Sequence, residues 1–220
     1  MRSATIPRMA SDAFRFDPPT PSDLGDHEVP RDGDALDGVR VALLVTGGIA
    51  AFKAPLLARA LRRQGAAVTA FATTEGLRYV AREALEWACH RPVVVELSAG
   101  AEHLSDDAPF DVYLVAPATY SVIGKAANGI ADTPVTATLA GAIGRVERGL
   151  ASVLFAPTMH GSMHNSILVG NLRRLHALGC AVVEPRDAYG KHNLPDEATL
   201  VEACAAAHRT RRTRNPQRSG

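Results

Sequence analysis

The chain has 220 residues, 46% of them hydrophobic, which suffices for one sizeable core and leaves little room for a second full domain. A formal net charge of +1 gives no global electrostatic reason to expect a nucleic acid or a membrane surface as a partner. Three cysteines without a CxxC pair argue against a disulfide framework and favour a reducing cytoplasm. Neither a run of about 18 apolar residues nor a signal-peptide pattern is present.

The composition changes near both ends of the chain. Residues 1–38 carry five prolines and eight acidic residues without an apolar period, which predicts a disordered or loosely attached arm. Residues 209–220 hold five arginines and no acidic residue, which predicts a frayed basic tail more than a contact with RNA. Residues 39–208 are then expected to form one folded domain.

Short apolar runs alternate with helical patterns through this domain. Six such runs, most of them rich in valine, predict strands at 41–46, 68–73, 92–97, 112–116, 152–156 and 181–184. They lack polar alternation, which is typical of parallel strands buried on both faces. Helical patterns at 52–65, 75–89 and 165–179 separate several of them. The alternation predicts a three-layer α/β protein with a doubly wound, Rossmann-like parallel sheet and a ligand site beyond the carboxyl ends of its strands.

The first two strand ends favour a nucleotide ligand. Gly47 and Gly48 allow a tight turn into a helix whose free N–H groups suit a phosphate, although a plain glycine turn is the alternative. Thr73 and Thr74 can hydrogen-bond a ribityl chain or a phosphate, unless Thr74 merely caps a helix. No acidic residue ends the second strand, where an NAD site would hold its ribose, so a mononucleotide is favoured over a dinucleotide.

The strand at 112–116 leads into a long polar stretch. Residues 116–132 read "APATYSVIGKAANGIAD", with hydroxyl and amide side chains among alanines and glycines. Most connections between elements are shorter than this one. Small and hydroxylated residues at the expected ligand edge predict a surface that contacts a flat or polar ligand.

Four separated motifs together resemble the FMN-dependent cysteine decarboxylase family. They are "TGGIAAFK" at 46–53, His103 thirteen residues before Ala116, the stretch at 116–132, and "APTMHGSM" at 156–163. The resemblance covers roughly residues 39–185, in the family's order. Members of that family act on phosphopantothenoylcysteine or on peptides that end in cysteine.

The resemblance implies a cofactor, a substrate and residue roles. It implies FMN bound by Gly48, Ile49, Ala50, Thr73, Thr119, Tyr120, Ser121, Val122 and Thr158. His103 would be the catalytic base or orienting group, and Met159 and His160 would contact a small-molecule or peptidyl cysteine substrate. The implied reaction oxidises the thiol to a thioaldehyde and then releases CO2. The implied assembly is a trimer, or a larger assembly of trimers, with FMN between subunits.

Three features depart from the family pattern. His160 stands where the family has an asparagine that contacts the substrate carboxylate, and the bulky Tyr120 stands where a small residue is usual. The spacing of His160 and His164 suggests a metal, but Gly161 and Ser162 disfavour a regular helix and no third ligand is near, so we expect no metal site.

The third departure is the absence of cysteine from residues 184–200, where members that serve coenzyme A synthesis carry a cysteine-containing clamp. The sequence therefore predicts an enethiol product or altered chemistry. A flavin prenyltransferase, another flavin oxidoreductase and a non-catalytic regulatory flavin-binding subunit are the alternatives left open.

Overall fold

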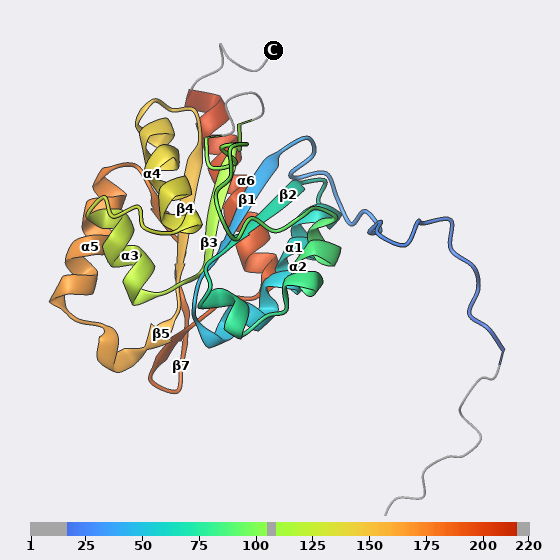
Figure 1. Ribbon diagram of the computed structural model, residues 1–220, viewed down its shortest axis with the longest axis horizontal. Coiled ribbons are helices and arrows are strands. Elements are labelled where there is room, and N and C mark those ends of the chain that lie inside the picture. The colour runs from blue at the N-terminus through green and yellow to red at the C-terminus, as the bar shows by residue number, and fades with distance from the viewer. Residues whose placement is uncertain (1–16, 105–108, 215–220) are drawn as a thin grey trace, which may run out of the picture.

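A parallel sheet forms the centre of the computed structural model, which describes residues 17–104 and 109–214. Its strand order is β2-β1-β3-β4-β6, and all neighbouring strands are parallel. The strands are β1 (Arg40–Val45), β2 (Ala67–Ala72), β3 (Val112–Ala118), β4 (Ser152–Pro157) and β6 (Ala181–Val182). The predicted doubly wound α/β fold is confirmed (Figure 1).

Helices cover both faces of the sheet (Figure 1). One face carries α1 (Ala54–Arg63), α2 (Arg82–Cys89) and α6 (Glu197–Arg214), and the other carries α3 (Tyr120–Ala127), α4 (Pro134–Glu147) and α5 (Ser166–Ala177). Alternate residues of β1 enter two separate cores: Leu43 packs with the first helix layer and Leu44 with the second. Apolar side chains of the helices cover both faces of the sheet, which is why the strand sequences show no polar alternation.

Two predicted elements differ in the structure. The run at 92–97 is not a strand: Val94 alone bridges to Phe71, outside the regular ladder. Pro92 has no N–H to donate, and Val93 is the only residue of the run that is buried, so the prediction was wrong there. The helical pattern at 75–89 is divided into the short 3-10 helix η2 (Gly76–Arg78) and α2, because Ala81 before α2 is extended.

A small antiparallel sheet, absent from the sequence prediction, stands beside the main one. It has the order β5-β8-β7, with β5 (Met159–His160), β7 (Arg186–Ala188) and β8 (Lys191–Asn193). Tyr189 and Gly190 join β7 to β8 with positive φ angles of 55° and 66°, as a tight hairpin turn requires. The predicted strand at 181–184 is correspondingly reduced to the two residues of β6.

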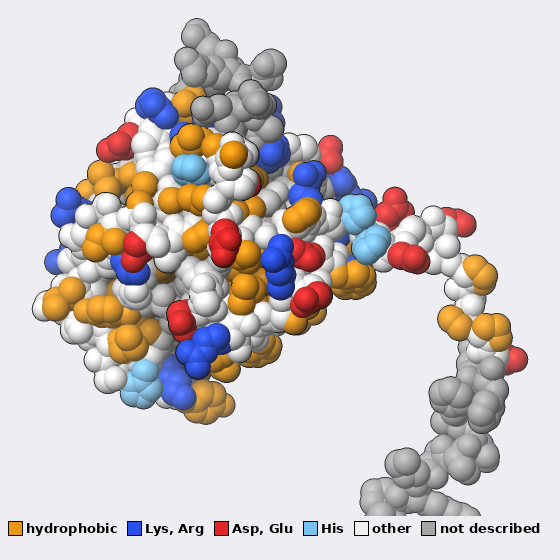
Figure 2. Space-filling view, viewed as in Figure 1, with side chains coloured by type: hydrophobic (Ala, Val, Ile, Leu, Met, Phe, Trp, Pro, Cys, Tyr) orange, Lys and Arg blue, Asp and Glu red, His pale blue; other side chains and the backbone are white. Residues whose placement is uncertain are grey.

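Residues just outside both predicted domain limits, 39 and 208, contact the folded body. The chain from residue 17 runs away from it (Figures 1 and 2), yet Leu36 is fully buried and its N–H donates to the carbonyl of Gln64. At the other end α6 continues to Arg214, and Arg211 donates to Asp111 Oδ1 at 2.8 Å. The limits 39–208 stay a prediction. Within residues 17–104 and 109–214, no helix combines the length and apolarity needed to span a bilayer.

Candidate functional site

A cavity of about 640 Å³ opens at the carboxyl ends of β1 and β3. β2 lies on one side of β1 and β3 on the other. The connection from β1 to β2 therefore runs toward one edge of the sheet, and the connection from β3 to β4 runs toward the opposite edge. Such a switch point leaves a crevice between adjacent strand ends. Thr46 follows β1, Thr119 follows β3 and Thr158 follows β4, and all three line the cavity.

The turn after β1 offers free backbone donors. Gly48 precedes the 3-10 helix η1 (Ile49–Lys53), which runs directly into α1, and no side chain caps this helix start. Its first N–H groups can therefore bind an anion. A Cβ built on Gly48 would lie 3.3 Å from both Pro117 Cγ and Thr119 Cγ2, which is tighter than an ordinary contact. Glycine thus keeps the backbone close to the cavity.

Threonine hydroxyls around the crevice are held in place by the backbone. Thr119 caps α3, since its Oγ1 accepts the N–H of Val122 at 3.5 Å. Thr46 donates to the carbonyl of Pro117 at 2.6 Å and lies 3.3 Å from Thr119 Oγ1. Thr73 Oγ1 accepts the N–H of Gly76 at 3.0 Å, so Thr73 rather than Thr74 provides the capping bond. The hydroxyl hydrogen of Thr73 remains free to bond a ligand, whereas Thr119 can donate its hydrogen either to Thr46 Oγ1 or to a ligand.

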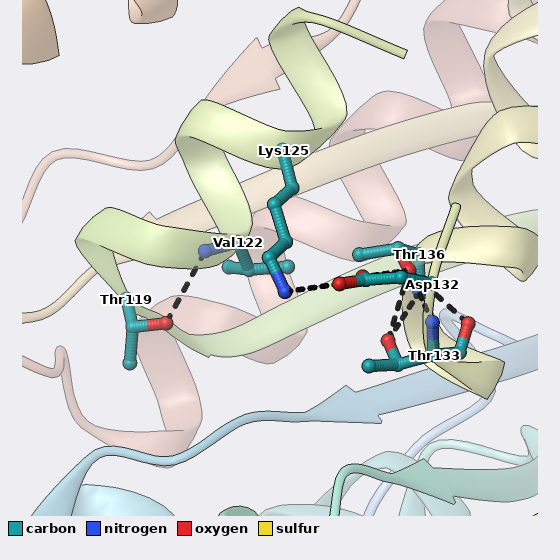
Figure 3. Close-up of polar contacts among 6 residues, drawn as sticks. All are labelled: Thr119, Val122, Lys125, Asp132, Thr133 and Thr136. Atoms are coloured by element: carbon teal, nitrogen blue, oxygen red, sulfur yellow. Dashed lines mark hydrogen bonds and ion pairs between the residues drawn. The ribbon is translucent and has the colours of Figure 1, made fainter. Parts of the chain in front are cut away.

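The start of α4 forms a further wall (Figure 3). Thr133 and Thr136 make a reciprocal capping box, with the N–H of each donating to the hydroxyl of the other at 2.9 and 3.1 Å. Lys125 on α3 donates to Asp132 Oδ2 at 2.7 Å, and this bond lowers the pKa of Asp132. No motif in the sequence identified Thr133 or Thr136 as part of a site, although Thr133 before Pro134 is a typical helix start.

The loop after β4 contributes the predicted substrate contacts. Met159 and His160 both line the cavity. His160 caps the 3-10 helix η3 (Gly161–Met163), because its Nδ1 accepts the N–H of Ser162 at 3.2 Å. The neutral ring then carries its hydrogen on Nε2. Tyr120 donates from its hydroxyl to Asn165 at 3.3 Å, which ties α3 to α5.

The cavity brings together every predicted flavin and substrate contact except Ala50. The residues that line it are Gly48, Ile49, Thr73, Thr119, Tyr120, Ser121, Val122, Thr158, Met159 and His160. Ala50 is buried and is not part of the wall. Lys191, His192 and Asn193 of β8 also line the cavity, and no motif in the sequence identified them.

His103 lies outside this cavity. Its carbonyl oxygen is 3.8 Å from a Cβ built on Gly141, which places it beside the middle of α4 rather than at the start of that helix. Its ring Nδ1 is buried and has no hydrogen-bond partner in the described part of the chain. The catalytic role of His103 stays a prediction, because within one chain this residue does not reach the cavity.

The two histidines considered as metal ligands make other bonds. His160 bonds Ser162, whereas His164 Nδ1 lies 2.7 Å from Nε2 of His192. Among residues 17–104 and 109–214, no group of three or more His, Cys, Asp or Glu side chains is placed to hold a metal ion.

The sheet order and the position of the cavity define a doubly wound α/β protein with a mononucleotide-type crevice at its switch point. The chain belongs to the Flavoprotein family, whose model matches residues 31–208. It is 35% identical over 171 residues to the coenzyme A biosynthesis bifunctional protein CoaBC of Thermococcus kodakarensis, and 32% identical over 179 residues to that of Bacillus subtilis. Each match covers 76% of this chain but only 41% or 42% of the relative, so the chain spans about two fifths of their length.

Solved structures resemble the fold closely. The FMN-dependent cysteine decarboxylase SpaF superposes with a TM-score of 0.68 at 25% identity, covering 80% of this chain and 98% of SpaF. The FMN-binding protein AtHal3 superposes with a TM-score of 0.64 at 21% identity, covering 75% of this chain and 94% of AtHal3. The resemblance predicted from four motifs is therefore confirmed at the level of the family.

Proposed function

We propose that the chain binds FMN and catalyses the oxidative decarboxylation of a cysteine-derived substrate. The observation that carries this proposal is the convergence of nearly all motif residues on one cavity at the β1–β3 switch point. The similarity to coenzyme A biosynthesis proteins and to SpaF supports the same activity.

The donor set of the cavity fits FMN. The uncapped helix start after Gly48 suits its phosphate, and the hydroxyls of Thr73 and Thr119 suit its ribityl chain and ring edges. The small residues at the start of α3 allow a flat ring to lie near the backbone. When bound, FMN would supply the two-electron oxidation of the cysteine thiol that precedes loss of CO2.

The substrate half of the cavity contains no thiol of this chain. All three cysteines are buried and none lines the cavity. Burial raises the pKa of Cys204 to about 12 and that of Cys180 to about 11, so neither supplies a thiolate near neutral pH. The product is therefore expected to leave as an enethiol rather than as the saturated thiol. Met159 and His160 would contact the substrate beside the flavin.

A complete site would need more than one copy of the chain. His103 lies away from the cavity of its own chain, and its buried Nδ1 has no hydrogen-bond partner among residues 17–104 and 109–214. We place FMN between subunits of a trimer, or of a larger assembly of trimers, in which a neighbouring copy brings His103 to the substrate.

The three unpaired, buried cysteines are compatible with a reducing cytoplasm.

The test is to purify the protein, record its visible spectrum, and incubate it with phosphopantothenoylcysteine and with cysteine-ended peptides. We expect flavin absorbance, CO2 release and an enethiol product by mass spectrometry. His103→Asn is expected to abolish CO2 release while the protein keeps its flavin. A colourless protein that takes up no added FMN would contradict the proposal, and a saturated thiol product would contradict its last step.

Flavin binding without catalysis is a second candidate, and one observation favours it: the predicted base lies outside the cavity. In that case the protein would be yellow, but neither substrate class would lose CO2 with the wild-type protein.

A further inference from the structure

The hairpin of β7 and β8 is fastened to the loop after β4 by three sets of contacts. β8 pairs with β5, with Met159 opposite His192 and His160 opposite Lys191. At the turn, Gly161 donates its N–H to the carbonyl of Gly190 at 2.9 Å. A Cβ on Gly161 would lie 2.3 Å from that oxygen, so this close approach requires glycine.

The third set is a chain of side-chain hydrogen bonds. His192 Nδ1 lies 2.6 Å from Asp187 Oδ1, and a carboxylate can only accept, so the ring donates. In the neutral ring Nε2 is then an acceptor, and it receives the N–H of His164 Nδ1 at 2.7 Å. Both nitrogens of His192 are thus engaged within the protein. His192 holds the hairpin in place and has no free nitrogen for a ligand.

This fastening places Lys191 at the cavity beside His160. The two residues are direct cross-strand neighbours, and both line the cavity. Residues paired in this way lie close enough for their side chains to act on one ligand. His160 contributes its Nε2–H, since Nδ1 is occupied by Ser162. On the surface around β5 and β7, basic side chains and a histidine lie next to an acidic side chain (Figures 1 and 2).

The acidic side chains near the cavity are already paired with other groups. Asp132 bonds Lys125, Asp187 bonds His192, and Glu75 forms an ion pair with Arg78 at 3.1 Å. In the part of the chain that the structure describes, Lys191 forms no hydrogen bond or ion pair through its ammonium group. A cation on a cavity wall whose ammonium group is not engaged in an ion pair is a binding group for an anion.

We propose that Lys191 and the Nε2–H of His160 form a subsite for an anionic group of the substrate, a phosphate or a carboxylate. The subsite rests on the proposed function for the identity of the substrate, but its chemistry is independent of the flavin. It makes Lys191 a determinant of substrate choice, because a neutral analogue would gain nothing from it.

Calorimetric titration of the intact protein tests the subsite. Three probes are used under conditions in which the protein does not convert them. Phosphopantetheine offers only a phosphate, pantothenoylcysteine is used with the flavin chemically reduced and offers only a carboxylate, and pantetheine is neutral. We expect Lys191→Ala to weaken binding of at least one anionic probe by about tenfold, which corresponds to about 1.4 kcal/mol. Pantetheine binding should be unchanged, and Lys191→Arg should largely restore the affinity.

Arg186→Ala is the matched control, since it removes one positive charge from the same hairpin at a position outside the cavity wall. A loss confined to phosphopantetheine identifies a phosphate, and a loss confined to pantothenoylcysteine identifies a carboxylate. Equal effects of Lys191→Ala and Arg186→Ala, an equal loss for pantetheine, or no anionic probe binding to the wild-type protein would each overturn the proposal. The flavin content, read from the visible spectrum of the same samples, reports separately on the proposed function.

Discussion

Gly48 is the residue whose replacement most directly tests the flavin half of the cavity. A side chain there would press on Pro117 and Thr119, each 3.3 Å from the built Cβ, and would cover the free amides of η1. We expect Gly48→Leu to weaken FMN binding by at least about tenfold, or about 1.4 kcal/mol. Gly170→Leu is the control, because a Cβ on Gly170 meets nothing within 4 Å. Fluorescence titration with FMN measures both, and equal affinities would contradict the assignment.

Most of the motif residues line the cavity, but the motifs gave no sign of Lys191, and His103 lies elsewhere. Gly48, Thr73 and Thr119 lie within three residues of the ends of buried strands, so the parallel sheet brings them to one edge. Lys191 reaches the cavity only through the pairing of β8 with β5, two strands that lie far apart in the sequence. No short-range pattern encodes such a contact. His103 shows the converse, since a match in spacing does not place its side chain in the cavity of its own chain.

The capping box at the start of α4 is a structural element that also forms part of the cavity wall. Thr133→Ala removes the acceptor for the N–H of Thr136, and loss of such a cap costs about 1 kcal/mol. Urea denaturation of the flavin-free protein should show this decrease in the free energy of unfolding. Thr133→Ser retains a hydroxyl and should stay within about 0.5 kcal/mol of the wild-type value. If the alanine variant were as stable as the serine variant, the cap would have no energetic role.

The helices and strands differ in how clearly the sequence predicts them, because their apolar patterns differ in strength. β1, β2, β3 and β4 are continuous apolar runs, because helices cover both of their faces, and such runs are readable from sequence. α3 has only eight residues, and half of the residues of α4 are alanine, glycine or threonine, so both give a weak helical pattern. β7 and β8 are three residues each and largely polar, so their stability comes from the turn and from β5 rather than from an apolar period. The run at 92–97 has the composition of a strand, but only Val93 in it is buried, and it lies at the edge of the sheet.

Two leucines, Leu24 and Leu36, differ in burial and so indicate where the folded body begins on its N-terminal side. Leu36 is fully buried in the same core as Leu61 and Val68, whereas Leu24 is 45% exposed. Residues 17–26 make hydrogen bonds only among themselves and with Glu28, within the described part of the chain. The segment just before residue 39 therefore belongs energetically to the domain, and the segment before residue 27 does not.

Leu36→Ala in the full chain should consequently lower the free energy of unfolding by about 2–5 kcal/mol, the usual cost of a leucine cavity. Leu24→Ala removes the same atoms from an exposed position and should change it by no more than about 0.5 kcal/mol. Urea denaturation gives both values, and limited proteolysis followed by intact-mass measurement should yield a resistant fragment that still contains Leu36. A fragment that begins after Leu36 and unfolds like the full chain would place the boundary at residue 39, as the composition alone predicted.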